Sequence, residues 1–434
     1  MPSWDECGNA NPEIGVVAKM DKKGLIVDMT QNHLNHCEVD PDLRLKSNAF
    51  TRKRKLTAKR ILMLLLQRLA YSLQLGVDKL FEHYGEESVS KQAFSKARAN
   101  LNPEFVRKFA DGIAEIHAQD PDAPSWKGMR LIAIDGTDIA LENSAELKEK
   151  FGCSGSKRNA ATALGSMAYG PLDQAIYDCR IAPYATDERE LAKLHMDRLL
   201  ELGLGGSLLL FDRGYPSAAF LARTLTAGFS FVMRVRKKWN LQADAIKDEG
   251  WISVSHEGMQ FPVRVLKVSL PSGETETLLT NLNESQLPLS QASQLYFKRW
   301  AIEIAFDILK SKLQLENFSG KTEVSVRQDF YATIYIAGFA MICAADATKK
   351  IVDADQGKNL KYARKANMNR TIAKLRDRFL FIILEENPNL RQVMLDRLCH
   401  DIATYSESIR PGRSPFRKLP RSKRFPIAKK SVLP

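Results

Sequence analysis

Leu131-Ile-Ala-Ile-Asp135 and Leu208-Leu-Leu-Phe-Asp212 are the two stretches that decide the fold. Each is a short apolar run that ends in an aspartate, a pattern that predicts a strand followed by an acidic side chain. Predicted strands and helices alternate around both runs, which favours a mixed α/β sheet with helices packed on it. The site of such a sheet lies at strand ends, so we expect both aspartates to belong to it.

A third acidic residue lies on a predicted helix that reads Tyr296-Phe-Lys-Arg299-Trp300-Ala-Ile-Glu303-Ile-Ala-Phe-Asp-Ile-Leu-Lys310. At 100° per residue, Tyr296, Arg299, Glu303 and Lys310 share a stripe about 60° wide. A carboxylate flanked by a phenol and two cations on one face predicts a site. The cations would hold a nucleic-acid backbone beside the reacting bond.

Two carboxylates at strand ends and one on a later helix suit a pair of Mg²⁺ or Mn²⁺ ions acting on a phosphodiester. We expect Asp135 to contact both ions, with Asp212 on one and Glu303 on the other. Each residue also has a structural explanation. Either aspartate, being followed closely by glycine, could be a turn residue, and Glu303 could pair with Arg299 as a helix salt bridge. The three together favour the metal site.

The net charge of +13 favours a polyanionic partner, of which nucleic acid is the commonest. Residues 44–60 carry eight Lys/Arg and no acid, residues 360–378 carry seven and one acid, and residues 409–434 carry nine and none. Solvated charged faces explain most single runs of this kind, but three in one chain indicate DNA binding.

The chain divides into segments with different patterns. Residues 1–44 are of uncertain structure apart from a short predicted strand at Leu25–Met29. Residues 45–120 predict a helical DNA-binding domain in which Ser88 or Ser90 caps a helix through Arg98. That helix offers Lys91, Gln92 and Arg98 to DNA. Residues 128–325 predict the catalytic domain with a β-rich insertion at about 237–290, residues 326–409 a helical region, and residues 410–434 a basic, proline-rich tail.

Cysteine spacing and hydropathy indicate the compartment. Six cysteines occur without a Cys-x-x-Cys pair, which fits a reducing cytoplasm. No signal peptide is indicated, and the longest uncharged apolar stretch, Phe330–Ala345, is too short to span a bilayer and predicts a buried helix. We therefore expect a cytoplasmic protein with no membrane segment.

Tyr296-x2-Arg299-x3-Glu303-x6-Lys310 resembles the Tyr-Arg-Glu-Lys signature of the bacterial DDE transposases of the insertion-sequence family numbered four. Asp135-Gly-Thr and Asp212-Arg-Gly-Tyr resemble the contexts of that family's two aspartates. The resemblance covers roughly residues 45–409. It implies an RNase H-like catalytic core with a β insertion and dependence on Mg²⁺ or Mn²⁺, with two ions in each site.

The resemblance also implies partners and roles. It implies a synaptic homodimer on double-stranded DNA, with cleavage of terminal inverted repeats and joining of 3′-hydroxyls to target DNA by a bacterial, nucleoid-associated enzyme. Tyr296, Arg299 and Lys310 match the residues that contact the transposon end. Trp300, beside them on the helix, is a candidate for base stacking or a core residue. A stand-alone metal-dependent nuclease and a catalytically inactive DNA-binding regulator stay open as alternatives.

Overall fold

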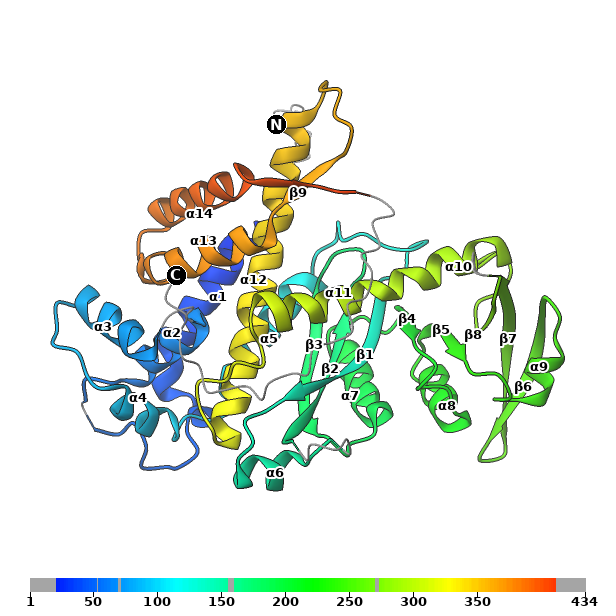
Figure 1. The fold of residues 1–434 in the computed structure, drawn as a ribbon, viewed down its shortest axis with the longest axis horizontal. Helices are drawn as coiled ribbons and strands as arrows, with labels where there is room; N and C mark the ends of the chain where they lie inside the picture. Colours follow the sequence, from blue (N-terminus) through cyan, green and yellow to red (C-terminus); the bar gives the residue numbers. More distant parts are fainter. Residues whose placement is uncertain (1–20, 53, 69–71, 155–159, 270–272, 411–434) are drawn as a thin grey trace, which may run out of the picture.

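A single mixed sheet of eight strands forms the centre of the computed structural model, which describes residues 21–410 apart from 53, 69–71, 155–159 and 270–272. The strand order is β3-β2-β1-β4-β5-β8-β7-β6 (Figure 1). The strands are β1 Leu131–Ala140, β2 Thr162–Tyr169, β3 Ile176–Pro183, β4 Leu208–Phe211, β5 Ser230–Val235, β6 Glu249–His256, β7 Met259–Ser269 and β8 Thr275–Thr280. Strands β1, β4 and β5 run parallel, and the other neighbouring pairs are antiparallel. The predicted mixed α/β sheet is confirmed.

Strand β4 and the first four residues of β1 are apolar because both of their faces are buried. Along β1, Leu131 and Ala133 belong to one core, whereas Ile132 and Ile134 belong to the other. The second core contains residues of α7 (Glu188–Glu201) and α8 (Ala218–Thr226). This alternation follows from the two-residue period of a strand, and it explains why the sequence reads as a continuous apolar run.

The predicted β-rich insertion continues the same sheet beyond β5. Strand β8 pairs antiparallel with β5, and β7 and β6 follow outward to the sheet edge. The short helix α9 (Leu241–Ala245) precedes these strands, and α10 (Leu289–Phe297) follows them. The insertion occupies one end of the molecule, opposite the N-terminal helices (Figure 1).

The N-terminal segment differs from the prediction, because Leu25–Met29 is helical and not a strand. These residues lie in α1 (Lys22–His36), whose buried Ile26, Val27, Thr30 and Leu34 follow a helical period. The following helices are α2 Ala58–Gln67, α3 Leu73–His83, α4 Lys91–Arg98, α5 Pro103–Ala118 and, within the sheet domain, α6 Ala145–Phe151. Ser90 is the predicted cap of α4, since its hydroxyl accepts from the Ala93 N–H.

A single long helix, α12 (Glu323–Asp355), runs through the middle of the molecule (Figure 1). It contains the predicted buried stretch Phe330–Ala345, of which all but Ala345 is buried. Length and hydropathy alone would let α12 cross a membrane, but 89% of its most apolar window is buried inside the molecule. The helix is therefore a core element, as predicted.

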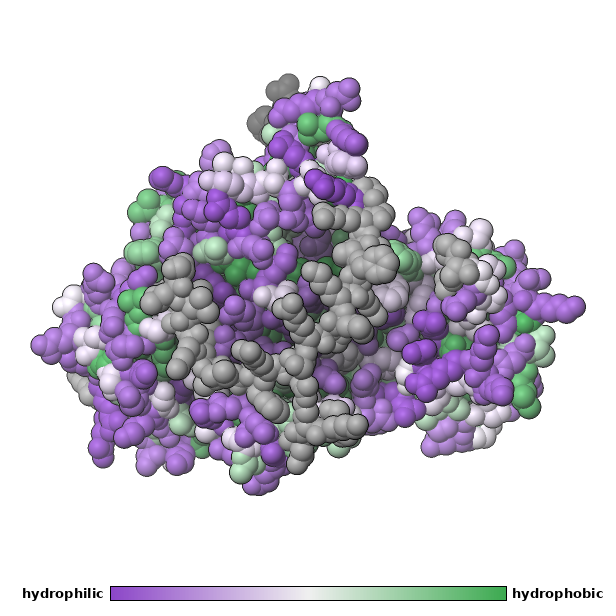
Figure 2. All heavy atoms as spheres, viewed as in Figure 1, coloured by the Kyte–Doolittle hydropathy of each residue, from purple (hydrophilic) through white to green (hydrophobic). Residues whose placement is uncertain are grey.

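The helices at the two ends of the chain share one core. That cluster extends from Ile26 of α1 to Ile402, through α5, α12 and one face of the sheet. The C-terminal elements are α13 Met368–Leu384, α14 Pro388–Ala403 and a small sheet of β9 Arg364–Ala366 with β10 Ser406–Ser408. On the face shown in Figure 2, hydrophobic side chains form only small groups among hydrophilic ones. The segments predicted as separate helical regions thus pack as one body, and the basic tail lies outside the described residues.

Candidate active site

Asp135 and Asp212 approach each other because two neighbouring parallel strands stop pairing at the same level. The pairing of β1 with β4 ends at Ala133 and Leu210, and Asp212 follows the last residue of β4. Strand β1 nevertheless continues to Ala140, since β2 still pairs with it and places Asp135 opposite Met167. The predicted strand end at Asp135 is therefore wrong. Asp135 instead lies within a strand, just beyond the end of its parallel neighbour.

The predicted helix over 296–310 is helical throughout but is not one regular α-helix. Helix α10 ends at Phe297, a 3₁₀ turn covers Lys298–Trp300, α11 covers Ala301–Asp307, and a π-helical turn covers Ile308–Lys312. Turns of 3₁₀ and π geometry rotate the following side chains away from the positions of an ideal wheel, and π turns are frequent at functional sites.

Arg299 joins two of the three predicted acidic ligands. Its Nη1 lies 3.0 Å from Asp135 Oδ2, and its Nη2 lies 3.0 Å from Glu303 Oε1. The Tyr296 hydroxyl donates to Asp212 Oδ1 at 3.3 Å. The side chain of Arg299 is only 3% exposed, so the guanidinium is fixed between the carboxylates. The structure thus brings five of the predicted residues together from β1, the end of β4 and the helical segment 296–303.

Lys310 reaches the same strand from the π-helical turn. Its Nζ lies 2.6 Å from Thr137 Oγ1 and 2.6 Å from the carbonyl oxygen of Asp138. Thr137 and Asp138 are on the part of β1 that extends past β4. The predicted stripe therefore follows the exposed end of β1, with Lys310 beyond the carboxylates.

The pKa of the Asp135 carboxyl is strongly raised. Burial raises its pKa to about 7, while Arg299 and the Gly136 N–H oppose the rise and the carboxylates of Glu188 and Asp212 add to it. A buried carboxylate among other carboxylates is where a cation is most strongly attracted.

Glu188, at the start of α7, is a further acidic residue close to Asp135 that was not among the predicted site residues. A Cβ on Gly136 would lie 2.9 Å from its Cδ, so this glycine leaves room for the carboxyl beside Asp135. Burial raises the pKa of Glu188, and the Asp212 carboxylate contributes to the rise. The only feature of the sequence that could have identified Glu188 is its position at a helix start after β3. Acidic residues are common at helix starts because they interact favourably with the helix dipole, so this feature is not specific to a site.

The donor set fits a hard divalent cation in chemistry, since Mg²⁺ and Mn²⁺ prefer carboxylate oxygens. Within the described ranges, however, no three His, Cys, Asp or Glu side chains are spaced to hold one ion. The guanidinium of Arg299 lies between Asp135 and Glu303 and neutralises both. The residues are thus assembled at one place, where Arg299 supplies the positive charge between Asp135 and Glu303.

Residues 126–337, which contain this whole assembly, match the family model described as the transposase DDE domain. A putative transposase, y4zB, of Sinorhizobium fredii (strain NBRC 101917 / NGR234) is 26% identical over 155 residues, covering 32% of this chain and 43% of that protein. Transposase InsG for insertion sequence element IS4 of Escherichia coli (strain K12) is 24% identical over 247 residues, covering 52% of this chain and 54% of that protein.

Residues 126–337 are therefore similar to a transposase DDE domain, and the chain is similar to these two transposases. The predicted resemblance to insertion-sequence family four is confirmed, and the chain spans about half the length of these two relatives. A piggyBac transposase synaptic complex with hairpin DNA aligns over 91% of this chain and 84% of that chain, at 13% identity and a TM-score of 0.43.

Trp300 was predicted to be either a base-stacking residue or a core residue, and the second prediction is wrong. It is 41% exposed, and its ring lies 5.3 Å from the Arg299 guanidinium carbon. Phe297 and Ile304, at helical spacing on either side, are 70% and 63% exposed. An exposed apolar stripe therefore adjoins the acidic site, which leaves base stacking as the hypothesis for Trp300.

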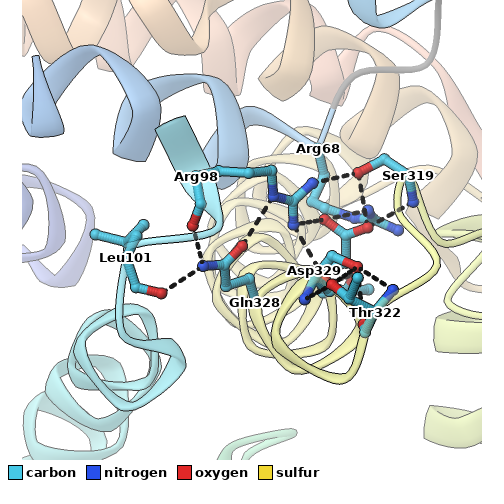
Figure 3. Close-up of polar contacts among 9 residues, drawn as sticks. Arg68, Arg98, Leu101, Ser319, Thr322, Gln328 and Asp329 are labelled. Atoms are coloured by element: carbon cyan, nitrogen blue, oxygen red, sulfur yellow. Dashed lines mark hydrogen bonds and ion pairs between the residues drawn. The ribbon is translucent and has the colours of Figure 1, made fainter. Parts of the chain in front are cut away.

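The predicted DNA contacts on α4 divide into two kinds. Lys91 and Gln92 are exposed, as a DNA contact requires. Arg98 is 3% exposed and donates to Gln328, Ser319, Ser325 and Asp329 near the start of α12 (Figure 3). The prediction of Arg98 as a DNA contact is wrong, because its guanidinium nitrogens are all used inside the protein.

Proposed function

We propose that the chain is a DNA transposase that binds terminal inverted repeats, cleaves the ends of its element and joins the 3′-hydroxyls to target DNA. The observation that supports this is the meeting of Asp135, Asp212 and Glu303, from β1, the end of β4 and α11, with Arg299 and Tyr296 between them. We further propose that strands β3-β2-β1-β4-β5 form an RNase H-like core, in which three antiparallel strands are followed by two parallel ones.

Asp135, Asp212 and Glu303 are the residues that would hold two Mg²⁺ or Mn²⁺ ions. When bound, such ions activate an attacking water or 3′-hydroxyl and stabilise the leaving oxygen. Lys310 supplies positive charge next to these carboxylates, which suits it to hold the DNA backbone at the reacting bond. Arg299 is 3% exposed and holds Asp135 and Glu303, so a DNA contact by its guanidinium would require it to leave these carboxylates. Tyr296 orients Asp212 through its hydroxyl. Proximity and electrostatics of this kind account for most of the catalysis in phosphoryl transfer.

The partners follow from the same proposal. We propose that a homodimer acts on double-stranded DNA, on paired transposon ends and on the target, at the nucleoid in the bacterial cytoplasm. The net charge of +13 supports a polyanionic partner. The exposed Lys91 and Gln92 of α4 are proposed DNA contacts outside the DDE domain.

Glu303→Gln tests the proposal, because it removes an anionic ligand while keeping the size of the side chain. We expect cleavage and strand transfer to fall by at least a hundredfold, since the loss of a metal ligand costs several kcal/mol of barrier. Binding to element-end DNA should be nearly normal, because the change removes negative charge. The measurement is a gel-shift assay together with nicking and strand transfer in Mg²⁺.

Asp307→Asn is the matched control, since it makes the same change one turn later on the same helix, at an exposed position. It should leave cleavage unchanged. Wild-type rates of cleavage by Glu303→Gln would contradict the proposed triad. A wild-type chain that cleaves but does not join pre-cleaved ends would be a nuclease, and one that binds without cleaving would be a regulator.

A further inference from the structure

A cavity of about 610 Å³ lies between the end of α2, the starts of α3 and α4, and the segment that precedes α12. Its lining includes Arg68, Lys91, Gln92 and Lys96, and it reaches inward to Asp329. The cavity lies outside the DDE site, since none of the three acidic residues or their arginine and tyrosine partners lines it. Three cationic side chains, those of Arg68, Lys91 and Lys96, line this cavity, and the acidic site does not account for them.

The buried charges behind this cavity do not balance. Asp329 is 3.0 Å from Arg98 Nη2 and 3.6 Å from Arg68 Nη1, so one carboxylate serves two guanidinium groups (Figure 3). The same carboxylate also accepts from the Ser319 N–H and hydroxyl. Arg376 is a third cation nearby. Burial lowers its pKa to about 10, and the positive charge of Arg68 contributes to this lowering. Positive charge is therefore in excess.

Arg68 has two donors that do not take part in this ion pair. It is 5% exposed, and its Nε and Nη2 are buried without a hydrogen-bond partner among the residues that the structure describes. Its backbone has a φ of +45°, in the left-handed region at the end of α2, which is unusual for a residue other than glycine. Stable proteins rarely bury unpaired donors, and a strained residue that carries them indicates a ligand position.

We propose that this cavity binds a phosphate group, held from inside by Arg68 and at its opening by Lys91 and Lys96. An arginine with two free donors on one edge matches the geometry of a phosphate, and the exposed lysines add charge without fixed geometry. The Gln92 amide, also in the lining, is a further donor. The phosphate belongs either to the DNA backbone, in which case the inference rests on the proposed function, or to a free phosphate compound.

The first measurement is the binding of inorganic pyrophosphate to the full chain, by calorimetry and by the shift in melting temperature. Wild-type protein should bind it saturably. The exposed double variant Lys91→Ala/Lys96→Ala should bind at least tenfold more weakly without loss of folding. Arg68→Gln should lose binding as well, with circular dichroism to check its fold. Lys349→Ala/Lys350→Ala, an exposed pair near the far end of α12, is the control and should match wild type.

The second measurement distinguishes the source of the phosphate. If it comes from DNA, the Lys91/Lys96 double variant should bind a duplex more weakly, with a salt slope lower by about one to two, and pyrophosphate should compete with DNA. If it comes from a free compound, pyrophosphate should bind while the DNA affinity of that variant equals that of the control. Equal pyrophosphate binding by wild type and the double variant would overturn the proposal. Glu303→Gln leaves the cavity intact, so failure of the catalytic proposal would be visible separately.

Discussion

At the scale of single residues, Arg299 is the centre of the acidic site. A buried arginine with two carboxylates within 3.0 Å offsets the repulsion that would otherwise separate Asp135 and Glu303. The same charge would have to share these carboxylates with any divalent cation. Arg299 therefore stabilises this cluster of carboxylates, although burial still raises the pKa of Asp135 to about 7.

The raised pKa of Asp135 predicts a pH-dependent difference in stability. Its folded-state pKa of about 7 exceeds the usual value of 3.8, so the folded protein binds the proton more tightly and loses that stabilisation as the pH rises towards 7. The Asp135→Asn variant has no titrating carboxyl at this position, so its stability does not change with pH for this reason. Relative to wild type, the variant should gain about 2–3 kcal/mol of unfolding free energy between pH 5 and pH 8, at 1.36 kcal/mol for each unit. Urea unfolding in EDTA at both pH values measures this, and a difference independent of pH would contradict it.

At the scale of elements, the interrupted helix determines which side chains face the site. The 3₁₀ turn at Lys298–Trp300 carries Arg299 towards β1 while it leaves Trp300 at the surface, and the π-helical turn directs Lys310 to Thr137. A regular helix would distribute these side chains on a single narrow stripe. The interruptions instead spread them along the exposed end of β1.

Trp300→Ala tests the stacking hypothesis for this element. An exposed indole beside the reacting bond can hold an unpaired base, which is worth about 1–3 kcal/mol in single-strand binding proteins. We expect the variant to lose second-strand cleavage by at least tenfold while first-strand nicking changes little. The melting temperature should stay within a few degrees, because the side chain is 41% exposed. Equal loss in both steps, together with a lowered melting temperature, would contradict stacking. Ile304→Ala, exposed on the same face, is the control.

At the scale of the whole molecule, the N-terminal helices are fixed to α12 by a buried polar cluster. Asp329 is 1% exposed, and Arg98 reaches it from α4 (Figure 3). Asp329→Asn would leave both buried guanidinium groups without a counter-charge. Removal of one partner of a buried ion pair typically costs about 3–5 kcal/mol. We expect a loss of this size in denaturant unfolding, whereas Asp353→Asn, exposed on the same helix, should change stability by less than about 0.5 kcal/mol.

The charge of the whole chain predicts a salt-dependent affinity for DNA. Residues 410–434 carry nine Lys/Arg and no acidic residue. Each phosphate that they neutralise adds about 0.9 to the slope of log affinity against log salt. Truncation after residue 409 should therefore lower affinity and reduce the slope by several units while folding is retained. The measurement is DNA binding at a series of salt concentrations, and an unchanged slope would show that the tail makes no phosphate contact.

Local sequence patterns predicted the mixed sheet, the apolar runs that become β4 and the start of β1, and the position of the β-rich insertion. Strand β4 and the cap of α4 follow from apolar period and capping chemistry, which depend on near neighbours in the chain. The spacing of Tyr296, Arg299 and Glu303 likewise survives in the structure, since it spans less than three helical turns.

The contacts between these elements depend on the three-dimensional packing of the chain and do not follow from the local patterns. Asp135 lies inside a strand because β2 pairs past the end of β4, and Arg98 is buried because α12, 230 positions away along the chain, supplies Gln328 as its partner. Glu188 lies next to Gly136 for the same reason. Burial and ion pairing depend on groups far apart in sequence, so local periodicity carries no information about them.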